Sequence, residues 1–383
     1  MAACRVHGLS KRLNTGGSMN RRENEFQAVT RAIGSAAVLR TEAALVVEGD
    51  SLPVLQDIPD GSISLIVTDP PYHATKKHNI FGDTKFEDDD QYLAWLALYV
   101  REWRRILRPN GSIYCFCDQT LSSRIEALFY QDYNVLSHIV WTKPNEPGFD
   151  GWKQKMKKEA LRQFYPHSER VIFAEPAIPG SLFKSHFAVT LKALRKTAGL
   201  TTYQLTEAIG AYGKVNHGGA VSNWEAGRNV PSRDQYALMC QAFKRTGRVK
   251  ATPAYEDIIR PFHMSGDREF TDIWNFPSVR PYKGKHPAEK PLSMLEHIVF
   301  TSSYPGDIVL DCFAGSGSTA AAATKLGRRA VSIEVDPHWT DMAKARLAGA
   351  DEASVVIEAP RAKLTGPKPR RKFADGRELN LFD

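Results

Sequence analysis

The residues Asp69-Pro70-Pro71-Tyr72 stand directly after an apolar run at positions 63–68. The run is rich in branched side chains and is expected to form a buried strand. Its exit carries a carboxylate, two prolines that fix the backbone and an aromatic ring. These groups suit a flat heterocyclic ring, with Asp69 accepting hydrogen bonds and Tyr72 stacking on its face. A simple strand-ending turn is the alternative interpretation.

A second motif, Asp-Cys-Phe-Ala-Gly-Ser-Gly-Ser-Thr at 311–319, follows a strand predicted over 307–311 and precedes an alanine-rich helix predicted over 319–326. Small residues in such a turn let the backbone approach a bound ligand. The strand that begins at Val331 ends in acidic residues, and a carboxylate at a strand end suits the vicinal hydroxyls of a ribose. The sequence therefore predicts a nucleoside cofactor site, although the turn alone fits any nucleotide.

The two motifs resemble motifs IV and I of amino-methyltransferases that use S-adenosylmethionine, in the permuted order of the beta class of DNA methyltransferases. The resemblance spans about residues 46–347 and includes His-Pro-Ala-Glu-Lys-Pro-Leu at 286–292. It implies a catalytic N-terminal half and a cofactor-binding C-terminal half. Asp50 could equally cap a helix. The residues expected to bind S-adenosylmethionine are Asp50, Lys290, Pro291, Asp311, Phe313, Ala314, Gly315, Ser316, Gly317, Ser318 and Glu334. The departures from the family pattern are Cys312, where proline is common, and Ser318, where threonine is common.

The exocyclic amine of a base is a poor nucleophile because its lone pair is delocalised into the ring. The Asp69 carboxylate and the Pro70 carbonyl can accept both amino hydrogens and so localise that lone pair. Tyr72 would stack on a base swung out of the duplex. The expected catalytic residues are Asp69, Pro70, Pro71 and Tyr72.

The resemblance implies a site-specific DNA methyltransferase, and the aspartate-led motif favours adenine N6. Cytosine N4 is the nearest alternative. A DNA-binding regulator with an inactive methyltransferase scaffold is a second, and methylation of RNA or of a protein glutamine amide is a third. The recognition sequence and any restriction partner cannot be read from the chain.

Buried strands alternate with helices along most of the chain, which predicts an α/β fold with a doubly wound, mostly parallel, Rossmann-like sheet. Strands are predicted at 45–47, at 63–68, at 112–117, at 135–141 and at 170–174. A helix is predicted from Asp90 to Leu107, and the residues Arg108-Pro109-Asn110-Gly111 predict a turn after it.

A region from 186 to 250 breaks this pattern with the apolar spacing of a small helical bundle. Residues 194–205 and 220–228 resemble the helix-turn-helix of phage-repressor-like DNA-binding domains, with a longer intervening stretch at 211–219. The resemblance implies that the helix near Gly219 enters the major groove. The alternative is an all-helical insertion that only packs against the rest of the protein and does not bind DNA. The basic 145–167 segment either contacts the DNA backbone or forms a solvated charged helix. With its lysines included, the expected DNA-binding residues are Lys153, Lys157, Asn216, His217, Ser222, Asn223 and Arg228.

The net charge of +8 and the isoelectric point near 9.1 suit a polyanionic partner, here double-stranded DNA. Five scattered cysteines predict reduced thiols and no metal site. No apolar run reaches membrane-spanning length, and no signal-peptide core precedes the first strand. We expect a cytoplasmic, nucleoid-associated protein of bacterial or phage origin, and the resemblance to beta-class methyltransferases implies a homodimer.

The expected organisation has five parts. Residues 1–25 form a flexible lead with folded structure from about Asn24, 26–185 the catalytic half, 186–250 the target-recognition insert, 251–350 the cofactor-binding half, and 351–383 a basic disordered tail. The tail ends in Glu-Leu-Asn-Leu-Phe, which resembles a peptide that docks on the replication sliding clamp through Leu379, Leu381 and Phe382, with glutamate in place of the usual glutamine. An ordinary apolar patch at the terminus is the alternative.

Overall fold

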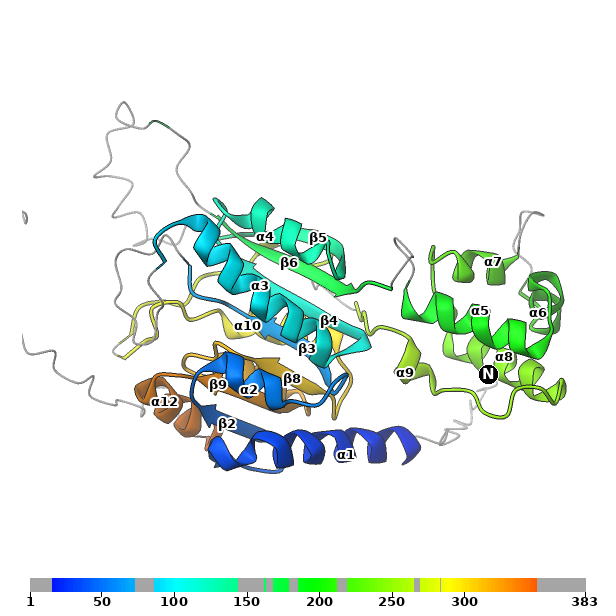
Figure 1. Ribbon diagram of the computed structural model, residues 1–383, viewed down its shortest axis with the longest axis horizontal. Helices are drawn as coiled ribbons and strands as arrows, with labels where there is room; N and C mark the ends of the chain where they lie inside the picture. Colours follow the sequence, from blue (N-terminus) through cyan, green and yellow to red (C-terminus); the bar gives the residue numbers. More distant parts are fainter. Residues whose placement is uncertain are drawn as a thin grey trace, which may run out of the picture.

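The computed structural model describes residues 16–72, 86–143, 162, 168–178, 185–211, 219–264, 269–282 and 284–349, and the side chains from residue 21 onward. Its strands form one sheet (Figure 1). They are β1 (Ala37–Arg40), β2 (Ala44–Glu48), β3 (Ile63–Thr68), β4 (Leu107–Cys117), β5 (Tyr133–Thr142), β6 (Ser168–Pro176), β7 (Ile273–Asn275), β8 (Ile308–Asp311) and β9 (Arg329–Glu334).

The nine strands lie in the order β1-β2-β9-β8-β3-β4-β6-β5-β7. Strands β2, β9, β8, β3 and β4 run parallel to one another, and β7 runs parallel to β5. Strand β1 is antiparallel to β2, and β6 is antiparallel to both β4 and β5. The predicted mostly parallel sheet is therefore confirmed.

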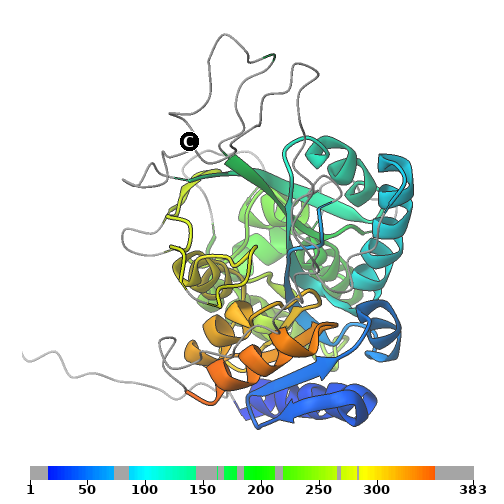
Figure 2. The ribbon, with the colours of Figure 1, turned by 90° about the vertical axis from the view of Figure 1, so that its left-hand side faces the viewer.

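Helices cover both faces of the sheet, as Figure 2 shows. One core cluster combines side chains of α1 to α4 with one face, and a second combines α10 and α11 with the other. The predicted doubly wound arrangement follows from this layering. These helices are α1 (Gly16–Ile33), α2 (Ser51–Asp57), α3 (Asp89–Ile106), α4 (Ser122–Phe129), α10 (Leu292–Ser302), α11 (Ser318–Lys325) and α12 (Pro337–Leu347), and a short 3-10 turn η1 (Gly34–Ala36) follows α1.

The predicted turn at 108–111 is wrong, because these residues belong to β4. A Cβ on Gly111 would lie 2.9 Å from the carbonyl oxygen of Ser64 on β3, so only glycine permits the close pairing at this point. The side-chain amide of Asn110 donates to the carbonyls of Glu256 and Ile259 at 2.9 and 3.2 Å. These partners lie far away in the sequence and hold an extended backbone where local turn chemistry predicts a reversal.

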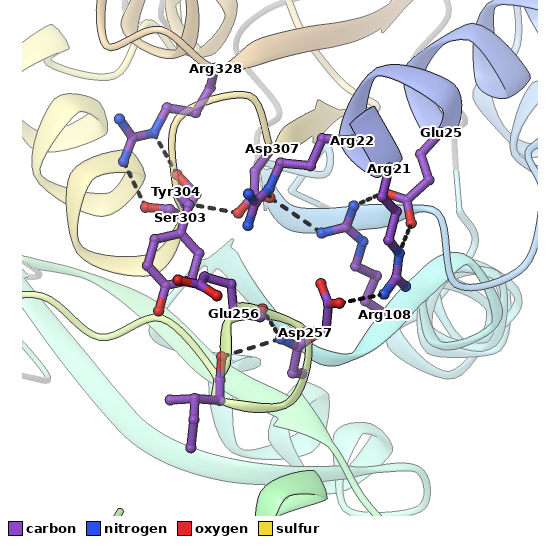
Figure 3. A network of polar contacts seen from close by, with 12 residues as sticks. Arg21, Arg22, Glu25, Arg108, Glu256, Asp257, Ser303, Tyr304, Asp307 and Arg328 are labelled. Carbon is purple, nitrogen blue, oxygen red and sulfur yellow. Dashed lines mark hydrogen bonds and ion pairs between the residues drawn. The ribbon is translucent and has the colours of Figure 1, made fainter. Parts of the chain in front are cut away.

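Helix α1 begins at Gly16, which corrects the expected start near Asn24. A buried ion-pair network anchors its first half to the sheet (Figure 3). Arg22 Nε lies 2.6 Å from Asp307 Oδ1, and Arg108 contacts the same oxygen at 3.2 Å. Glu25 pairs with Arg108. The polar, basic composition that predicts a solvated lead instead serves this network, whose acidic partner precedes β8.

The predicted helical insert forms a unit with its own apolar core. Arg195 and Glu225 join its first and third helices through a two-pronged ion pair at 2.5 and 2.8 Å. The core includes Ile258 and Ile259, so the unit extends beyond the expected end at 250. Its helices are α5 (His186–Ala198), α6 (Thr202–Ala208), α7 (Ala220–Glu225), α8 (Arg233–Arg245) and α9 (Tyr255–Ile258).

The unit lies at the edge of the sheet where the parallel strands begin (Figure 1). A cavity of about 1630 Å³ separates it from the sheet domain. Its walls include α8 and α9 on one side and the residues that precede β2, β8 and β9 on the other. Within the described ranges, none of the helices combines the length and hydropathy needed to cross a membrane.

Candidate active site

Strands β8 and β3 are neighbours in the centre of the sheet, and the chain leaves them toward opposite faces. The residues after β8 lead into α11 on one face, whereas α3 packs on the other. Such a reversal creates a crevice at the carboxyl ends of the strands, where α/β proteins bind ligands. Asp69 follows β3 and Asp311 ends β8. The two predicted motifs therefore meet at one place in the fold.

Asp69 is largely buried and forms an ion pair with Lys290, whose ammonium nitrogen lies 2.5 Å from Oδ2. The other oxygen, Oδ1, is buried and has no hydrogen-bond partner among the described residues. Burial raises the pKa of the Asp69 carboxyl, and the positive charge of Lys290 opposes that rise. Lys290 thus holds Oδ2, and a hydrogen bond with Tyr72 also lowers the pKa of the Asp69 carboxyl.

Glu169 at the start of β6 completes this charged cluster. Lys290 lies 3.4 Å from its Oε2, and Lys143 at the end of β5 pairs with Oε1. Burial alone would raise the pKa of Glu169, but the two ammonium groups lower it to about 2. Glu169 therefore stays ionised and orients both lysines.

Tyr72 stands beside the same cluster. Its hydroxyl donates to Glu169 Oε2 at 3.2 Å, and the centre of its ring lies 5.6 Å from the Lys290 nitrogen. Burial raises its pKa well above the ordinary value, so the hydroxyl keeps its proton. Pro70 is buried and Pro71 is half-buried. All four predicted catalytic residues thus lie together at the end of β3.

The glycine-rich turn is built around Asp311. Its carboxylate accepts hydrogen bonds from the amide of Phe313 at 3.2 Å and from the Thr319 hydroxyl at 2.7 Å. Burial raises the pKa of Asp311 to about 7. Gly317 has φ +77°, and a Cβ there would lie 2.7 Å from the Cβ of Ala343 on α12. Asp311 and Gly317 therefore shape the turn, which explains their residue types without a ligand.

Glu334, the last residue of β9, accepts from the amide of Gly315 at 2.7 Å through Oε2. Its Oε1 accepts from the amides of Val335 and Asp336 at 2.9 and 3.0 Å. Burial raises the pKa of Glu334 against these hydrogen bonds. Gly315, with φ +49°, is covered by the His286 ring, which lies 3.1 Å from the position of an added Cβ. Glu334 joins the ends of β8 and β9 at the predicted cofactor site.

Arg346 on α12 connects the turn to the segment before α10. Its guanidinium lies 3.0 Å from Glu289 Oε1 and donates to the hydroxyls of Ser318 and Ser316 at 2.5 and 3.3 Å. Tyr282 donates to Glu289 Oε2 at 2.7 Å. Ser316 and Ser318, predicted as cofactor residues, are therefore held through Arg346.

An aromatic wall borders the turn on the side of α3. The Phe313 ring lies 5.1 Å from that of Tyr99 and 5.9 Å from that of Trp95.

Asp50 follows β2, is exposed, and accepts from the amide of Leu52 at 3.2 Å as the N-cap of α2. Ala314 and Pro291 are buried beside the same crevice, Pro291 at the start of α10. The predicted cofactor residues surround the carboxyl ends of β2, β9 and β8.

The three predicted DNA-binding residues that the structure describes do not join this site. Ser222, Asn223 and Arg228 belong to the helical unit at the opposite edge of the sheet. The other four, Lys153, Lys157, Asn216 and His217, lie outside the described residues, as do the tail residues Leu379, Leu381 and Phe382.

The structure also brings in residues that sequence reasoning missed, namely Glu169, Lys143, Glu289 and Arg346. Glu169 and Lys143 carried one usable signal, because charged residues at the ends of apolar strands stand at a sheet edge. Glu289 lies inside the quoted 286–292 motif, yet nothing in the sequence indicates that it pairs with a residue of the last helix.

Residues 63–345 match the protein family N6_N4_Mtase, described as DNA methylase. The chain belongs to this family. It is a DNA methyltransferase, and the crevice between β8 and β3 is the site where its two family motifs meet.

Three relatives of this methyltransferase align over most of their lengths. DNA adenine methyltransferase YhdJ of Escherichia coli (strain K12) is 27% identical over 309 residues, covering 80% of this chain and 83% of the relative. Type II methyltransferase M.BglII of Bacillus subtilis is 25% identical over 79% of this chain and 69% of the relative. Type II methyltransferase M.Cfr9I of Citrobacter freundii is 25% identical over 84% and 93%.

Two solved structures are similar to the methyltransferase. The M1.HpyAVI-SAM complex is 19% identical and covers 79% of this chain and 98% of its own, with a TM-score of 0.45. The cytosine-N4-specific PvuII DNA methyltransferase is 15% identical and covers 81% and 88%, with a TM-score of 0.48.

Proposed function

We propose that this DNA methyltransferase transfers a methyl group from S-adenosylmethionine to N6 of adenine in duplex DNA. The observation that carries the proposal is the buried Asp69 carboxylate, which keeps one oxygen without a partner beside the glycine-rich turn. A buried acceptor without a partner is costly unless a ligand satisfies it. An amino group of a base is a ligand of this kind.

Asp69 and Pro70 act on the amino group. Oδ1 of Asp69 accepts one amino hydrogen, and the carbonyl of Pro70 accepts the other. Both interactions draw the nitrogen toward a tetrahedral geometry, in which its lone pair points away from the ring. Lys290 keeps Asp69 ionised and therefore an acceptor. Pro71 has no amide hydrogen that would compete for these oxygens.

Tyr72 stacks on the face of the base. A base inside a duplex is inaccessible at its amino group, so the target must swing out of the helix. The Tyr72 ring is half-buried, and the hydrogen bond to Glu169 fixes its orientation. Tyr72 then offers one flat surface to the extruded base, and stacking replaces part of the lost base-pair stacking.

The crevice suits S-adenosylmethionine, the second ligand of the reaction, in its chemical groups. The aromatic ring of Phe313 and the carboxylates of Asp50 and Glu334 surround the strand ends where a nucleoside would lie. Glu334 accepts from the ribose hydroxyls, and Asp50 from the adenine amine. The backbone at Ala314 and Gly315 lies against the ligand. When bound, S-adenosylmethionine supplies the electrophilic methyl group.

Adenine is favoured because the motif begins with aspartate and because the relative YhdJ is named a DNA adenine methyltransferase. Cytosine N4 is the second candidate, since the family covers both amino positions by name. Both reactions use the same acceptors, Asp69 and Pro70.

Further features belong to the same proposal. The enzyme is of the beta class, forms a homodimer and acts in the bacterial or phage-infected cytoplasm at the nucleoid. The helical unit is a helix-turn-helix that binds duplex DNA.

The tail peptide with Leu379, Leu381 and Phe382 docks on the replication sliding clamp. Removing the last six residues should weaken clamp binding, and unchanged binding would refute the docking.

The function is tested by long-read sequencing of genomic DNA from a host that lacks DNA methylases and expresses this chain or its Asp69→Ala variant. We expect one sequence motif to carry N6-methyladenine in the wild-type strain alone. Modified cytosine N4 in a motif would correct the base and keep the mechanism. An unmodified genome in cells that contain folded protein would contradict the proposal.

A further inference from the structure

The helical unit lies at the amino ends of the parallel strands, and the catalytic residues lie at their carboxyl ends. Asn110, near the start of β4, anchors α9, whereas Thr68 pairs with Cys115 near the end of the same strand, next to Asp69. Five residues of strand separate these two levels, roughly 17 Å. In Figure 2 the catalytic edge faces the viewer, and the helices of the unit lie behind the sheet.

The unit carries most of the net positive charge of the chain. Residues 186–259, which include α9, contain ten Lys or Arg and five Asp or Glu, which gives them a net charge of +5, whereas the whole chain has +8. Positive charge of this density attracts the phosphate backbone of nucleic acids. Among the described residues, the exposed basic ones are Lys192, Lys196, Arg228, Arg233, Lys244, Arg245, Arg248 and Lys250, of which Arg233 pairs with Glu256.

Helices α6 and α7 pack closely against each other. Val221 and Trp224 of α7 are buried in the core of the unit, and a Cβ on Gly219 would lie 2.6 Å from the Thr206 hydroxyl on α6. Glycine is therefore required where the two helices meet. The opposite side of the pair is open, because Tyr203 is 65% exposed and Arg228 is exposed.

Contacts that attach the unit come from its other helices. Asp257 lies 3.1 Å from Arg21 of α1, and Asn110 binds the carbonyls of Glu256 and Ile259. Residues of α8 and α9 line the cavity toward the sheet domain. Helix α6 lies at the end of the unit farthest from the sheet (Figure 1). The open side of the helix pair is thus left for a partner of its own.

We propose that this unit binds a second duplex segment, separate from the segment that is methylated. The inference rests on the proposed function, because it takes the crevice at Asp69 as the place where the target base enters. DNA has a persistence length of about 150 base pairs. A duplex of two or three turns that delivers a base to the catalytic edge does not bend around the sheet to reach α7. One chain therefore holds two duplexes, or two distant parts of one long DNA.

The test uses the full chain and two short duplexes of about two helical turns each. One carries the motif found by sequencing, and the other is of mixed sequence without it. The Lys192→Ala, Lys196→Ala double variant removes two exposed cations from α5 of the unit. The matched control, Arg31→Ala with Arg101→Ala, removes two exposed cations from α1 and α3. Circular dichroism and thermal unfolding identify any variant that has lost its fold.

Analytical ultracentrifugation at low salt should find two duplexes for each wild-type or control chain and one for the Lys192→Ala, Lys196→Ala variant. In a plot of log affinity for the mixed-sequence duplex against log salt concentration, the slope should become shallower by about two. One unit is expected for each lost phosphate contact. Methylation of the short motif duplex should keep its kcat/KM within about twofold, since that duplex occupies the other edge.

Two results would overturn the inference. A raised KM for the short motif duplex, or a changed methylation motif, in the unit variant would show that the unit reads the target segment itself, from the same chain or from a second copy. A single duplex for each wild-type chain would show that no second site exists. Two bound duplexes without any methylation would contradict the proposed function and leave the second site in place, so the two failures are distinguishable.

Discussion

The ammonium nitrogen of Lys290 lies 2.5 Å from Oδ2 of Asp69, although 221 residues separate the two in the sequence. The pair sits at the junction of the two halves of the methyltransferase, because Asp69 follows β3 and Lys290 precedes α10. Burial favours the neutral carboxyl and the ammonium favours the carboxylate. A residue of the cofactor half therefore favours the ionised form of an acceptor in the catalytic half.

Replacing Lys290 with glutamine should raise the pKa of Asp69 further, because the amide keeps a hydrogen-bond donor but loses the charge. The ionised fraction of Asp69 then falls at neutral pH. The acid limb of the kcat/KM profile for methyl transfer should move up by about one to three pH units. Steady-state assays across pH measure this shift. The exposed Lys325, which pairs with Glu296, gives the matched control Lys325→Gln. A uniform loss of rate with an unmoved limb would make Lys290 purely structural.

Asp311 should make the protein less stable as pH rises. The native carboxyl keeps its proton up to about pH 7, whereas the unfolded one loses it near pH 3.8. Between these values the native state binds more protons than the unfolded state, so the free energy of unfolding falls as pH increases. The contribution of this group is at most about 1.4 kcal/mol per pH unit. Urea titrations from pH 4 to 8 should show a shallower decline in Asp311→Asn, and equal slopes would contradict the buried, protonated carboxyl.

Alanine substitutions at Gly317 and Gly327 distinguish the stability cost of steric overlap from the cost of backbone strain. Both have left-handed φ values, +77° and +73°. A Cβ on Gly317 would meet Ala343 at 2.7 Å, whereas nothing lies within 4 Å of one on Gly327. Gly327→Ala should therefore cost only the strain, about 1–2 kcal/mol, and Gly317→Ala should lose about 1–3 kcal/mol more through overpacking. Equal unfolding free energies in chemical denaturation would mean that α12 yields to the added methyl group.

Arg22 and Arg21 test whether the first half of α1 is part of the folded domain. Arg22 is buried against Asp307, whereas the Arg21 side chain is 48% exposed beside Asp257. Arg22→Ala leaves a buried acid short of one partner and should lower the free energy of unfolding by about 3–5 kcal/mol. Arg21→Ala should lower it by less than about 1 kcal/mol. A small loss in both variants would indicate that Arg108 alone satisfies Asp307.

The strands that hold the site could be predicted because their signals are local. Strand β3 is a continuous run of buried residues, and the groups that follow it, Asp69 to Tyr72, must lie at its carboxyl end whatever the rest of the chain does. The same holds for β8, its glycine-rich turn and Glu334 at the end of β9. Their joint position in one crevice follows from the doubly wound sheet.

Tertiary structure decided everything that depends on a partner distant in sequence. The sequence predicts that Arg22 belongs to a solvated lead, but in the fold it pairs with Asp307. It predicts a turn at Asn110, but in the fold the Asn110 amide donates to a carbonyl of α9. Glu169 reads as an ordinary surface acid until Lys290 and Lys143 surround it. The edge of the sheet that carries the helical unit was equally undetermined. A charged or polar side chain has no preferred place of its own, because its free energy is set by burial and by the opposite charge it meets, and only the folded chain supplies both.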